Sequence, residues 1–318
     1  MSSNNDQSPF HRGEQAIQNR VGVRERVEKI GNIAIRDHLP DQHREFYAQL
    51  AFVFIGALDR PGRPWASMLF GRPGFIESPD SRTLEVRTSM IDGDPLAGEL
   101  APDSSLGLLG MEYETRRRNR LSAQVIVAEP NRLSLRVVQS FGNCPQYIQA
   151  RSASVLDAID CLGQARDIHV ISSFDDKASQ LVTSADNFYI ASHHREEAES
   201  VSGGADVSHR GGKPGFVKVL DDVTLQFPDY AGNNHFNTFG NLLLNPQAGL
   251  TFVDFERGDI VFFSGRTEII WEGPDVEKIP GAKRLVRFTL EQGRRVTNAV
   301  PIRWHFLSYS PRLDQLSD

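Results

Sequence analysis

The sequence is short of cysteine and of long apolar runs, and both shortages exclude classes of protein. Its longest apolar stretch, Leu50–Leu58, has nine residues, about half of what a membrane-spanning helix needs. The first dozen residues are polar and hold no apolar core of a secretory signal. The two cysteines, Cys144 and Cys161, form no C-x-x-C pair and are too few for a disulfide framework. We therefore expect a cytoplasmic protein with free thiols and no membrane partner.

Motifs that mark several well-known enzyme and metal classes are also missing. No G-x-G-x-x-G follows a strand-like run, and Lys213 is followed by Pro214 where a phosphate-binding P-loop has Ser or Thr. The nine histidines include no H-x-x-x-H spacing and no Cys/His quartet, so we expect no metal site. The G-x-S-x-G elbow of serine hydrolases is absent as well.

Acidic residues outnumber basic ones, and most of the basic residues are arginine. The net charge of −6 argues against a nucleic-acid partner, because phosphate neutralisation needs a basic face. Only six of the 35 basic residues are lysine, which leaves 29 arginines. Arginine offers a planar fork suited to phosphate and carboxylate, although a genome-wide codon habit explains such a bias equally well.

With 318 residues the chain is long enough for two domains, and it contains an internal repeat. The segment Gly71–Ile76 (GRPGFI) recurs 141 residues later as Gly212–Val217 (GKPGFV). At an offset of 142, one residue more, the segment Glu112-Tyr113-Glu114 corresponds to Asp254-Phe255-Glu256. Because the matches are collinear, we interpret the chain as two copies of one unit.

Each copy has the strand spacing of a small antiparallel barrel. Short β-type runs recur about every ten residues between turn residues, and alternating β-α units are absent. The expected strands are Ala51–Gly56, Arg82–Arg87, Leu106–Met111, Leu121–Val127 and Leu133–Val138 in the first copy, and Asn187–Ala191, Val223–Phe227, Gly249–Phe255, Ile260–Phe263, Thr267–Trp271 and Arg284–Leu290 in the second.

Helices are expected at the start of each copy, over Asp41–Gln49 and Asp175–Ser184, in an arm over Glu14–Asp37 and in a linker over Ser152–Ala165. We divide the chain into a polar N-terminus and helical arm (1–40), a first barrel (41–142), a helical linker (143–180), a second barrel (181–310) and a tail (311–318). Residues 195–214 are expected to form a polar loop of the second copy.

Three polar concentrations could bind an anion. The stretch Ser208–Gly215 places His209, Arg210 and Lys213 beside glycines that allow close backbone approach. In the first copy the residues corresponding to His209 and Arg210 are apolar. A solvated basic turn is the alternative interpretation.

The second concentration is Tyr230–Asn241, where four Asn, one His and one Thr precede the apolar run of a helix. A helix start rich in such donors suits a phosphate, and simple N-capping is the alternative. The third is Glu114–Arg120, with four Arg in five residues at a hairpin; its alternative is a solvated turn. If the two barrels pack together, these patches could face one shared crevice.

The whole pattern resembles the pyridoxamine 5′-phosphate oxidase-related family of FMN-binding split barrels. The carriers in the second copy are SHRGGKPGFVKV, FPDYAGNNHFNTFGNLLLNPQAGLTF and FFSGRTEIIW, and in the first copy GRPWASMLFGRPGFI, GLLGMEYETRRRNR and QSFGNCPQYIQ. The resemblance implies a mainly β fold with flanking helices, in which two tandem six-stranded split barrels form an intramolecular pseudo-dimer. It also implies FMN at the interface between the barrels.

The resemblance carries over site roles to particular residues. The family's phosphate site matches Lys218 and the turn with Asn234, Asn237 and Thr238, and Arg118 falls where the family often has a Gln that contacts the flavin ring. The candidate cofactor-binding residues are His209, Arg210, Lys213, Lys218, Asn234, Asn237, Thr238, Arg116, Arg117 and Arg118. The S-R-K helix start of the true oxidases reads His-Phe-Asn-Thr here, which counts against pyridoxamine phosphate as the substrate.

We therefore expect an FMN-dependent oxidoreductase that acts on a small molecule, with catalytic residues and substrate unassigned and with a homodimer of the two-barrel chain left open. The alternatives are a non-catalytic flavin- or ligand-binding protein, and a barrel that has lost its cofactor and serves as an interaction module. Cys144 has no base beside it in the sequence and is interpreted as structural.

Overall fold

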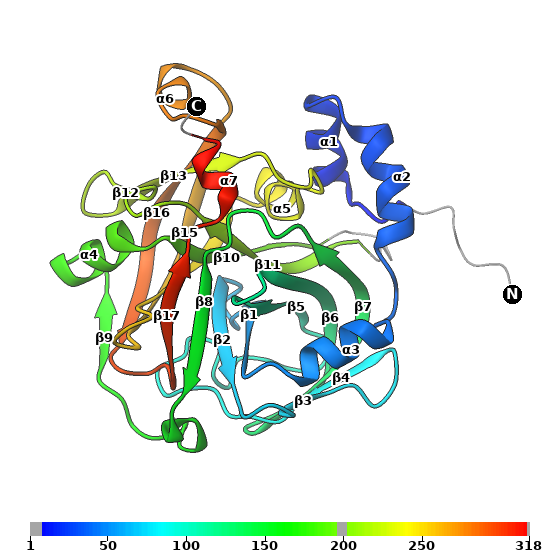
Figure 1. Cartoon of the computed structure of the whole chain (residues 1–318), viewed down its shortest axis with the longest axis vertical. Coiled ribbons are helices and arrows are strands. Elements are labelled where there is room, and N and C mark those ends of the chain that lie inside the picture. Colours follow the sequence, from blue (N-terminus) through cyan, green and yellow to red (C-terminus); the bar gives the residue numbers. More distant parts are fainter. Residues whose placement is uncertain (1–7, 196–201, 317–318) are drawn as a thin grey trace, which may run out of the picture.

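The computed structural model describes residues 8–195 and 202–316 (Figure 1). The first half contains α1 (Arg12–Arg20), α2 (Arg24–Ala34), α3 (Asp41–Ala48), β1 (Phe52–Leu58), β2 (Pro64–Phe70), β3 (Ile76–Glu77), β4 (Thr83–Val86), β5 (Ser105–Glu112), β6 (Arg117–Glu129), β7 (Arg132–Asn143) and β8 (Ala150–Val155). The second half contains a 3-10 turn (Asp157–Asp160), β9 (Ile168–Ile171), α4 (Asp176–Ser184), β10 (Asn187–His194), β11 (Gly204–Gly211), β12 (Lys218–Val219), β13 (Thr224–Tyr230), α5 (Asn237–Leu244), β14 (Gln247–Val253), β15 (Ile260–Ile270), α6 (Pro274–Glu277), β16 (Ala282–Val296), β17 (Ile302–Ser308) and α7 (Pro311–Asp314).

Two antiparallel sheets repeat the same strand order. The first runs β2-β1-β5-β6-β7-β4-β3 and the second β11-β10-β14-β15-β16-β13-β12, with β9 beside β16. The registers agree as well: Ile55 pairs with Ser67 and Leu108, and Ile190 pairs with Ser208 and Leu250. The prediction of two tandem split barrels is confirmed. Each path has seven strands rather than six because a two-residue strand, β3 or β12, extends it.

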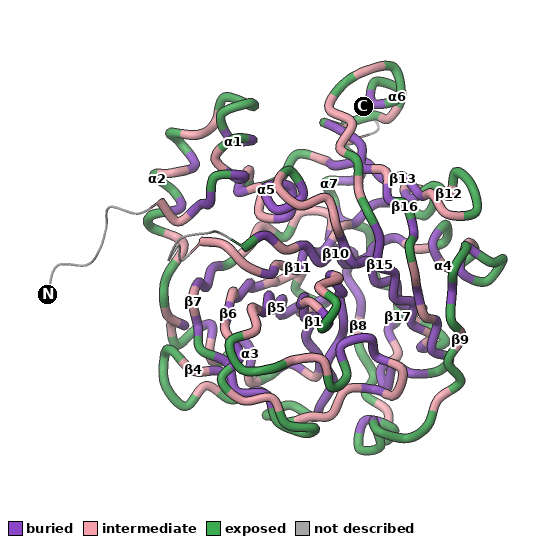
Figure 2. The backbone as a smooth tube through the Cα atoms, turned by 180° about the vertical axis from the view of Figure 1, so that it is seen from behind, coloured by how far each residue is buried: buried purple, intermediate pink, exposed green. Residues whose placement is uncertain are grey.

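The two barrels pack through equivalent strands. Along β1, β5, β10 and β14 nearly every residue is buried, because one face fills a barrel and the other meets the neighbouring barrel (Figure 2). A Cβ on Gly107 would lie 2.7 Å from the Asp206 Cα, and a Cβ on the corresponding Gly249 would lie 2.5 Å from the Pro64 carbonyl oxygen. Glycine at both positions lets the backbones touch, so the interface has approximate twofold symmetry.

The helical arm is two helices rather than the expected single one. Gly22, with φ of +71°, ends α1, and α2 begins at Arg24. Helix α1 lies against α5 of the second barrel (Figure 1), where a Cβ on Gly13 would approach the Gly240 carbonyl oxygen to 2.2 Å. The arm is thus anchored on the second barrel although it precedes the first barrel in the sequence.

Two expectations about the middle of the chain are wrong. The linker predicted as a helix over Ser152–Ala165 contains β8, which pairs with β17, followed by the short 3-10 turn. The polar loop expected over 195–214 contains β11 from Gly204 onward, paired with β10; its residues 196–201 lie outside the described residues. Within the described residues no helix is long and apolar enough to cross a membrane.

Candidate functional site

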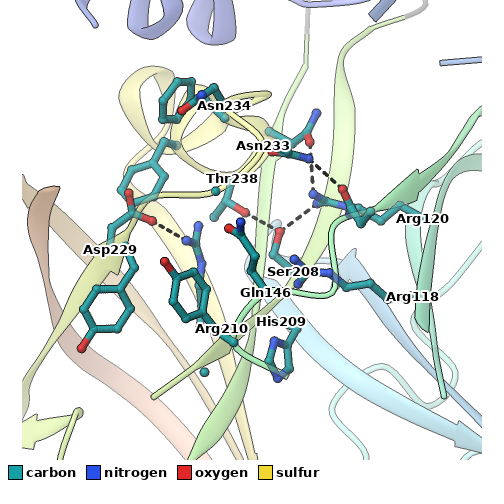
Figure 3. A pocket seen from close by; sticks show the side chains of 18 of the residues that line it. Arg118, Arg120, Gln146, Ser208, His209, Arg210, Asp229, Asn233, Asn234 and Thr238 are labelled. Carbon is teal, nitrogen blue, oxygen red and sulfur yellow. Dashed lines mark hydrogen bonds and ion pairs between the residues drawn. The ribbon is translucent and has the colours of Figure 1, made fainter. Parts of the chain in front are cut away.

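A crevice opens where the two barrels meet (Figure 3). It holds about 840 Å³ of space that no protein atom fills, its open mouth included. The first barrel and the segment after it supply Leu109, Arg118, Arg120, Asn143, Gln146 and Tyr147. The second supplies Ser208–Gly211, Pro228–Tyr230, Gly232–Asn234 and the start of α5, Phe236–Phe239. A ligand in this crevice would contact both copies of the repeat.

A buried hydrogen-bond cluster forms the wall at the start of α5. Arg120 donates to Ser208 Oγ at 2.8 Å and forms an ion pair with Asp206. The Thr238 hydroxyl lies 2.7 Å from Ser208 Oγ and donates to Asp206 at 3.1 Å. Asp206 is therefore an internal anion that already occupies the hydroxyl donors at the helix start.

The same wall is connected to the N-terminal arm. Arg120 donates to Asn237 Oδ1 at 3.1 Å, and the Asn237 amide donates to Glu14 of α1. Burial lowers the pKa of Arg120 to about 9 and raises the pKa of Glu14 to about 8. Gln18 of α1 donates to the His235 carbonyl oxygen at 3.1 Å. Helix α1 thus holds both α5 and the loop before it.

A second ion-pair cluster lies across the crevice. Arg210 contacts Asp229 at 2.5 Å, and Arg284 contacts the other carboxylate oxygen of Asp229 at 3.1 Å. Burial raises the pKa of Asp229, while the two guanidinium groups act in the opposite direction. Because Arg210 also lies over the Phe239 ring, 4.9 Å from its centroid, its position is fixed on two sides.

Arg118 is the cation that remains available in the crevice. Its Nε donates to the Cys144 carbonyl oxygen at 2.8 Å, and among the described residues it forms no ion pair. Burial, with Arg210 nearby, lowers its pKa to about 10, so the group stays charged at neutral pH. An unpaired guanidinium at the edge of a cavity is suited to an anionic ligand.

His209 is buried beside Arg118 and Arg210, and neither of its ring nitrogens has a hydrogen-bond partner among residues 8–195 and 202–316. Burial, together with the positive charge of Arg118, Arg151 and Arg210, holds its pKa well below 6.5, so the imidazole is neutral. Two other polar atoms of the lining, Arg210 Nε and Gln146 Oε1, are also buried and unpartnered. Buried polar atoms are usually paired, and these four belong to residues that line the crevice.

The structure brings together six of the ten residues predicted from the sequence. These are Arg118, His209, Arg210, Asn234, Asn237 and Thr238, all of which line the crevice. The other four do not line it. Lys213 pairs with Asp314 at 3.1 Å and Lys218 is exposed on β12. Arg116 donates to the Ile148 carbonyl oxygen, and Arg117 stacks on Phe46 at 4.4 Å.

Sequence reasoning missed residues that hold the walls in place, among them Glu14, Gln146, Asp206 and Asp229. For Arg120 a signal was present. The register places it at the position that Phe262 has in the second sheet, so this position is polar in one copy and apolar in the other, as are the positions of His209 and Arg210.

The symmetry-related position in the other half of the molecule is filled by apolar side chains. The registers match His209 with Met68, Arg210 with Leu69, Arg118 with Ile260 and Arg120 with Phe262. All four apolar residues are at most 2% exposed. The duplicated frame therefore provides one polar crevice and one closed counterpart.

Comparison with known proteins gives a family match over the second barrel. Residues 174–307 match the family model described as "Pyridoxamine 5'-phosphate oxidase". Solved structures with partial similarity include HupZ from Group A Streptococcus (18% identity, TM-score 0.30, 37% of this chain and 90% of that one). Others are a putative pyridoxamine 5'-phosphate oxidase from Lactobacillus delbrueckii (15%, 0.30, 38% and 93%) and an FMN-binding protein from Syntrophomonas wolfei (12%, 0.27, 42% and 86%). No curated protein matches the sequence.

Proposed function

Since residues 174–307 belong to the pyridoxamine 5′-phosphate oxidase-related family, we propose that this chain binds FMN in the crevice between its barrels and is a flavin-dependent oxidoreductase. The observation that carries the proposal is a crevice whose walls come from both barrels and which Arg118 lines without a carboxylate partner among the described residues. An anionic ligand in this crevice would contact both copies of the repeat.

The charges of the crevice fit an anionic cofactor. Arg118, Arg120, Arg210 and Arg284 are matched by two carboxylates, Asp206 and Asp229, which leaves an excess of two positive charges. Arg118 has no carboxylate partner among the described residues, so we assign it to the negative charge of the cofactor. The hydroxyl of Thr238 is engaged by Asp206, and we therefore do not assign the phosphate to the helix start alone.

FMN, when bound, supplies hydride or electron transfer at its ring, and the protein supplies orientation, charge and exclusion of water. His209 is neutral, so one of its ring nitrogens donates and the other accepts, which suits a ring edge that presents both kinds of group. Arg210, fixed by Asp229 and Phe239, places a positive charge beside the same position.

The substrate would enter past Tyr147 and Tyr230, whose rings lie 5.3 Å apart beside the loop with Asn233 and Asn234. These groups are uncharged, unlike the cationic site that a phosphorylated substrate would need. We infer a small substrate without a phosphate group.

Colour and titration test the proposal. Purified protein should be yellow or take up added FMN, with quenching of flavin fluorescence. Arg118→Ala should weaken FMN binding about 10- to 100-fold, the size of a lost charge-assisted contact. Arg117→Ala, its neighbour on the opposite face of β6, is the matched control and should bind FMN like the wild type. A colourless protein that binds no FMN would refute the proposal.

Turnover separates an enzyme from a flavin-binding protein without catalysis. Reduced protein should be reoxidised by dioxygen or a quinone, and small amines and alcohols should reduce the bound flavin. If FMN binds but no compound of these classes changes its redox state, the non-catalytic alternative is correct.

A further inference from the structure

Helix α1 lies outside the crevice but contacts the helix that forms part of its wall. No residue of α1 is among those that line the crevice. The backbones of α1 and α5 meet at Gly13 and Gly240, where a Cβ on Gly240 would lie 2.6 Å from the Glu14 backbone nitrogen. A side chain at either glycine would separate the two helices. Helix α1 is therefore packed directly against the helix whose first turn lines the crevice.

The residue that precedes this first turn has an unfavourable backbone conformation. Phe236 has φ of +63° and ψ of +26°, a left-handed conformation that bulky residues rarely adopt. Asn234, two residues earlier, has the same φ, which asparagine tolerates better. Both residues line the crevice. A strained conformation of this kind persists only where contacts with the surrounding structure hold it.

Two hydrogen bonds from α1 flank Phe236 in the sequence. On one side, Gln18 donates to the His235 carbonyl oxygen at 3.1 Å. On the other side, the Asn237 amide donates to the Glu14 carboxylate. Gln18 and Glu14 are at most 2% exposed, so water does not compete for these bonds. Helix α1 thus fixes the backbone before the strained residue and the side chain after it.

The contact extends from α1 to a cation of the crevice. Asn237 Oδ1 accepts a hydrogen bond from Arg120 at 3.1 Å, so the Asn237 amide joins Glu14 to Arg120. Arg120 in turn donates to Ser208 Oγ at 2.8 Å. Asn237, Arg120 and Ser208 all line the crevice. Without Glu14, Asn237 would lose the acceptor that orients its side chain, and Arg120 would lose a fixed partner.

We propose that Glu14 and Gln18 are positioning residues of the crevice, and that docking of α1 on α5 and binding of an anionic ligand in the crevice strengthen each other. The two states are α1 docked, with Phe236 and Asn237 held, and α1 undocked, with both released. A ligand that contacts Asn237 binds the docked state better, so it favours docking by the same factor. FMN as this ligand rests on the proposed function, whereas the coupling requires only an anion at this wall.

Hydrogen exchange of the unmodified full-length chain tests the coupling without any variant. Saturating FMN should slow exchange of the α1 backbone amides about tenfold more than exchange in α4 (Asp176–Ser184), which is the size expected for one hydrogen bond. Helix α4 is the control because none of its residues lines the crevice, and a general stabilisation of the fold affects both helices. Equal slowing in α1 and α4 would overturn the proposal.

Variants of α1 test the two positioning residues. Gln18→Ala should weaken FMN binding about tenfold, and Asn19→Ala, the exposed amide next to it, should bind like the wild type. Glu14→Ala should also bind about tenfold more weakly, whereas Glu14→Gln keeps an oxygen that accepts from Asn237 and should bind within about threefold of the wild type. Wild-type affinity in both alanine variants would overturn the proposal.

Inorganic pyrophosphate, an anion without a flavin ring, separates this inference from the proposed function. If the chain binds no FMN but pyrophosphate slows exchange in α1 relative to α4, the flavin proposal is wrong and the coupling stands. If FMN binds and α1 is not slowed relative to α4, the coupling alone is wrong. If neither anion binds, both proposals are refuted.

Discussion

His209 has the environment of a core residue and the chemistry of a binding residue. It is 5% exposed, neutral, and unpartnered at both ring nitrogens. An apolar side chain at this position would make the ligand-free protein more stable, because each unsatisfied buried polar group lowers stability by roughly 1–3 kcal/mol. The first copy shows such a replacement, with Met68 fully buried at the matching place. A costly polar group at such a position is typical of residues kept for binding.

His209→Met should therefore make the ligand-free protein more stable, by about 1–2 kcal/mol, and should weaken FMN binding. Chemical denaturation without ligand and FMN titration measure the two effects. The reverse change, Met68→His, should only destabilise, because it places an imidazole in a closed apolar position. A less stable His209→Met variant with unchanged FMN affinity would contradict this interpretation.

The arginine-rich segment is only partly predictable from its residues. Four Arg in five residues suggest a hairpin turn, but β6 already begins at Arg117. Side chains alternate along a strand, so Arg118 and Arg120 face the crevice while Arg117 packs on Phe46. Asp206 and Glu14 could not have been found in this way, since their partners are 86 and 223 residues away in the sequence.

At the scale of elements, the contact between α1 and α5 links the N-terminal arm to the crevice. The two helices touch at Gly13 and Gly240, and Glu14 is buried there, with its carboxylate accepting from Asn237 and from the His11 backbone N–H at 2.8 Å. Charged and polar groups near Glu14 are Arg120 of β6, Arg24 of α2 and His11. A buried acid between these elements makes their packing sensitive to pH.

The raised pKa of Glu14 predicts a loss of stability between about pH 4.5 and 8. Its pKa is raised from 4.5 to about 8, so the folded chain holds this proton more tightly than the unfolded chain, and stability falls as pH rises towards 8. The buried histidines, with pKa lowered to about 4 (His11, His43, His193 and His235), act in the opposite direction, up to about one pH unit above the unfolded histidine pKa of about 6.5. Their contribution is common to the wild type and a Glu14→Gln variant, so the difference between the two proteins isolates Glu14.

Urea denaturation of the wild type and Glu14→Gln at pH 6.5, 7.25 and 8 measures this effect. Relative to the variant, the wild type should lose at most about 1.4 kcal/mol per pH unit in this window. If the stability of the two proteins changed with pH in the same way, Glu14 would be ionised in the folded protein over the whole range from pH 6.5 to 8.

The elements themselves were largely predictable where local pattern decides them, as for α3, α4 and most strands of both sheets. Prediction failed at β8. There the apolar residues Val155, Ile159 and Leu162 have helical spacing, but Val155 lies in a strand and the other two are buried through the 3-10 turn. The partner that makes β8 a strand, β17, is about 150 residues away, and a local pattern carries no information about it.

At the scale of the whole molecule, the duplication creates two equivalent places but only one polar crevice. The counterpart is filled by Met68, Leu69, Ile260 and Phe262. We therefore expect one FMN per chain, measured by titration of absorbance against protein concentration. Two equivalents bound with similar affinity would mean that the closed counterpart opens, and would contradict the asymmetry.

Joining the two barrels in one chain also changes how the crevice responds to dilution. In a two-chain assembly the walls separate as protein concentration falls, whereas here one wall follows the other at a fixed effective concentration. Ligand affinity should then be the same at nanomolar and micromolar protein. The covalent link also releases the two halves from having to mutate together: one substitution alters one wall, so one half can specialise while its copy remains a scaffold.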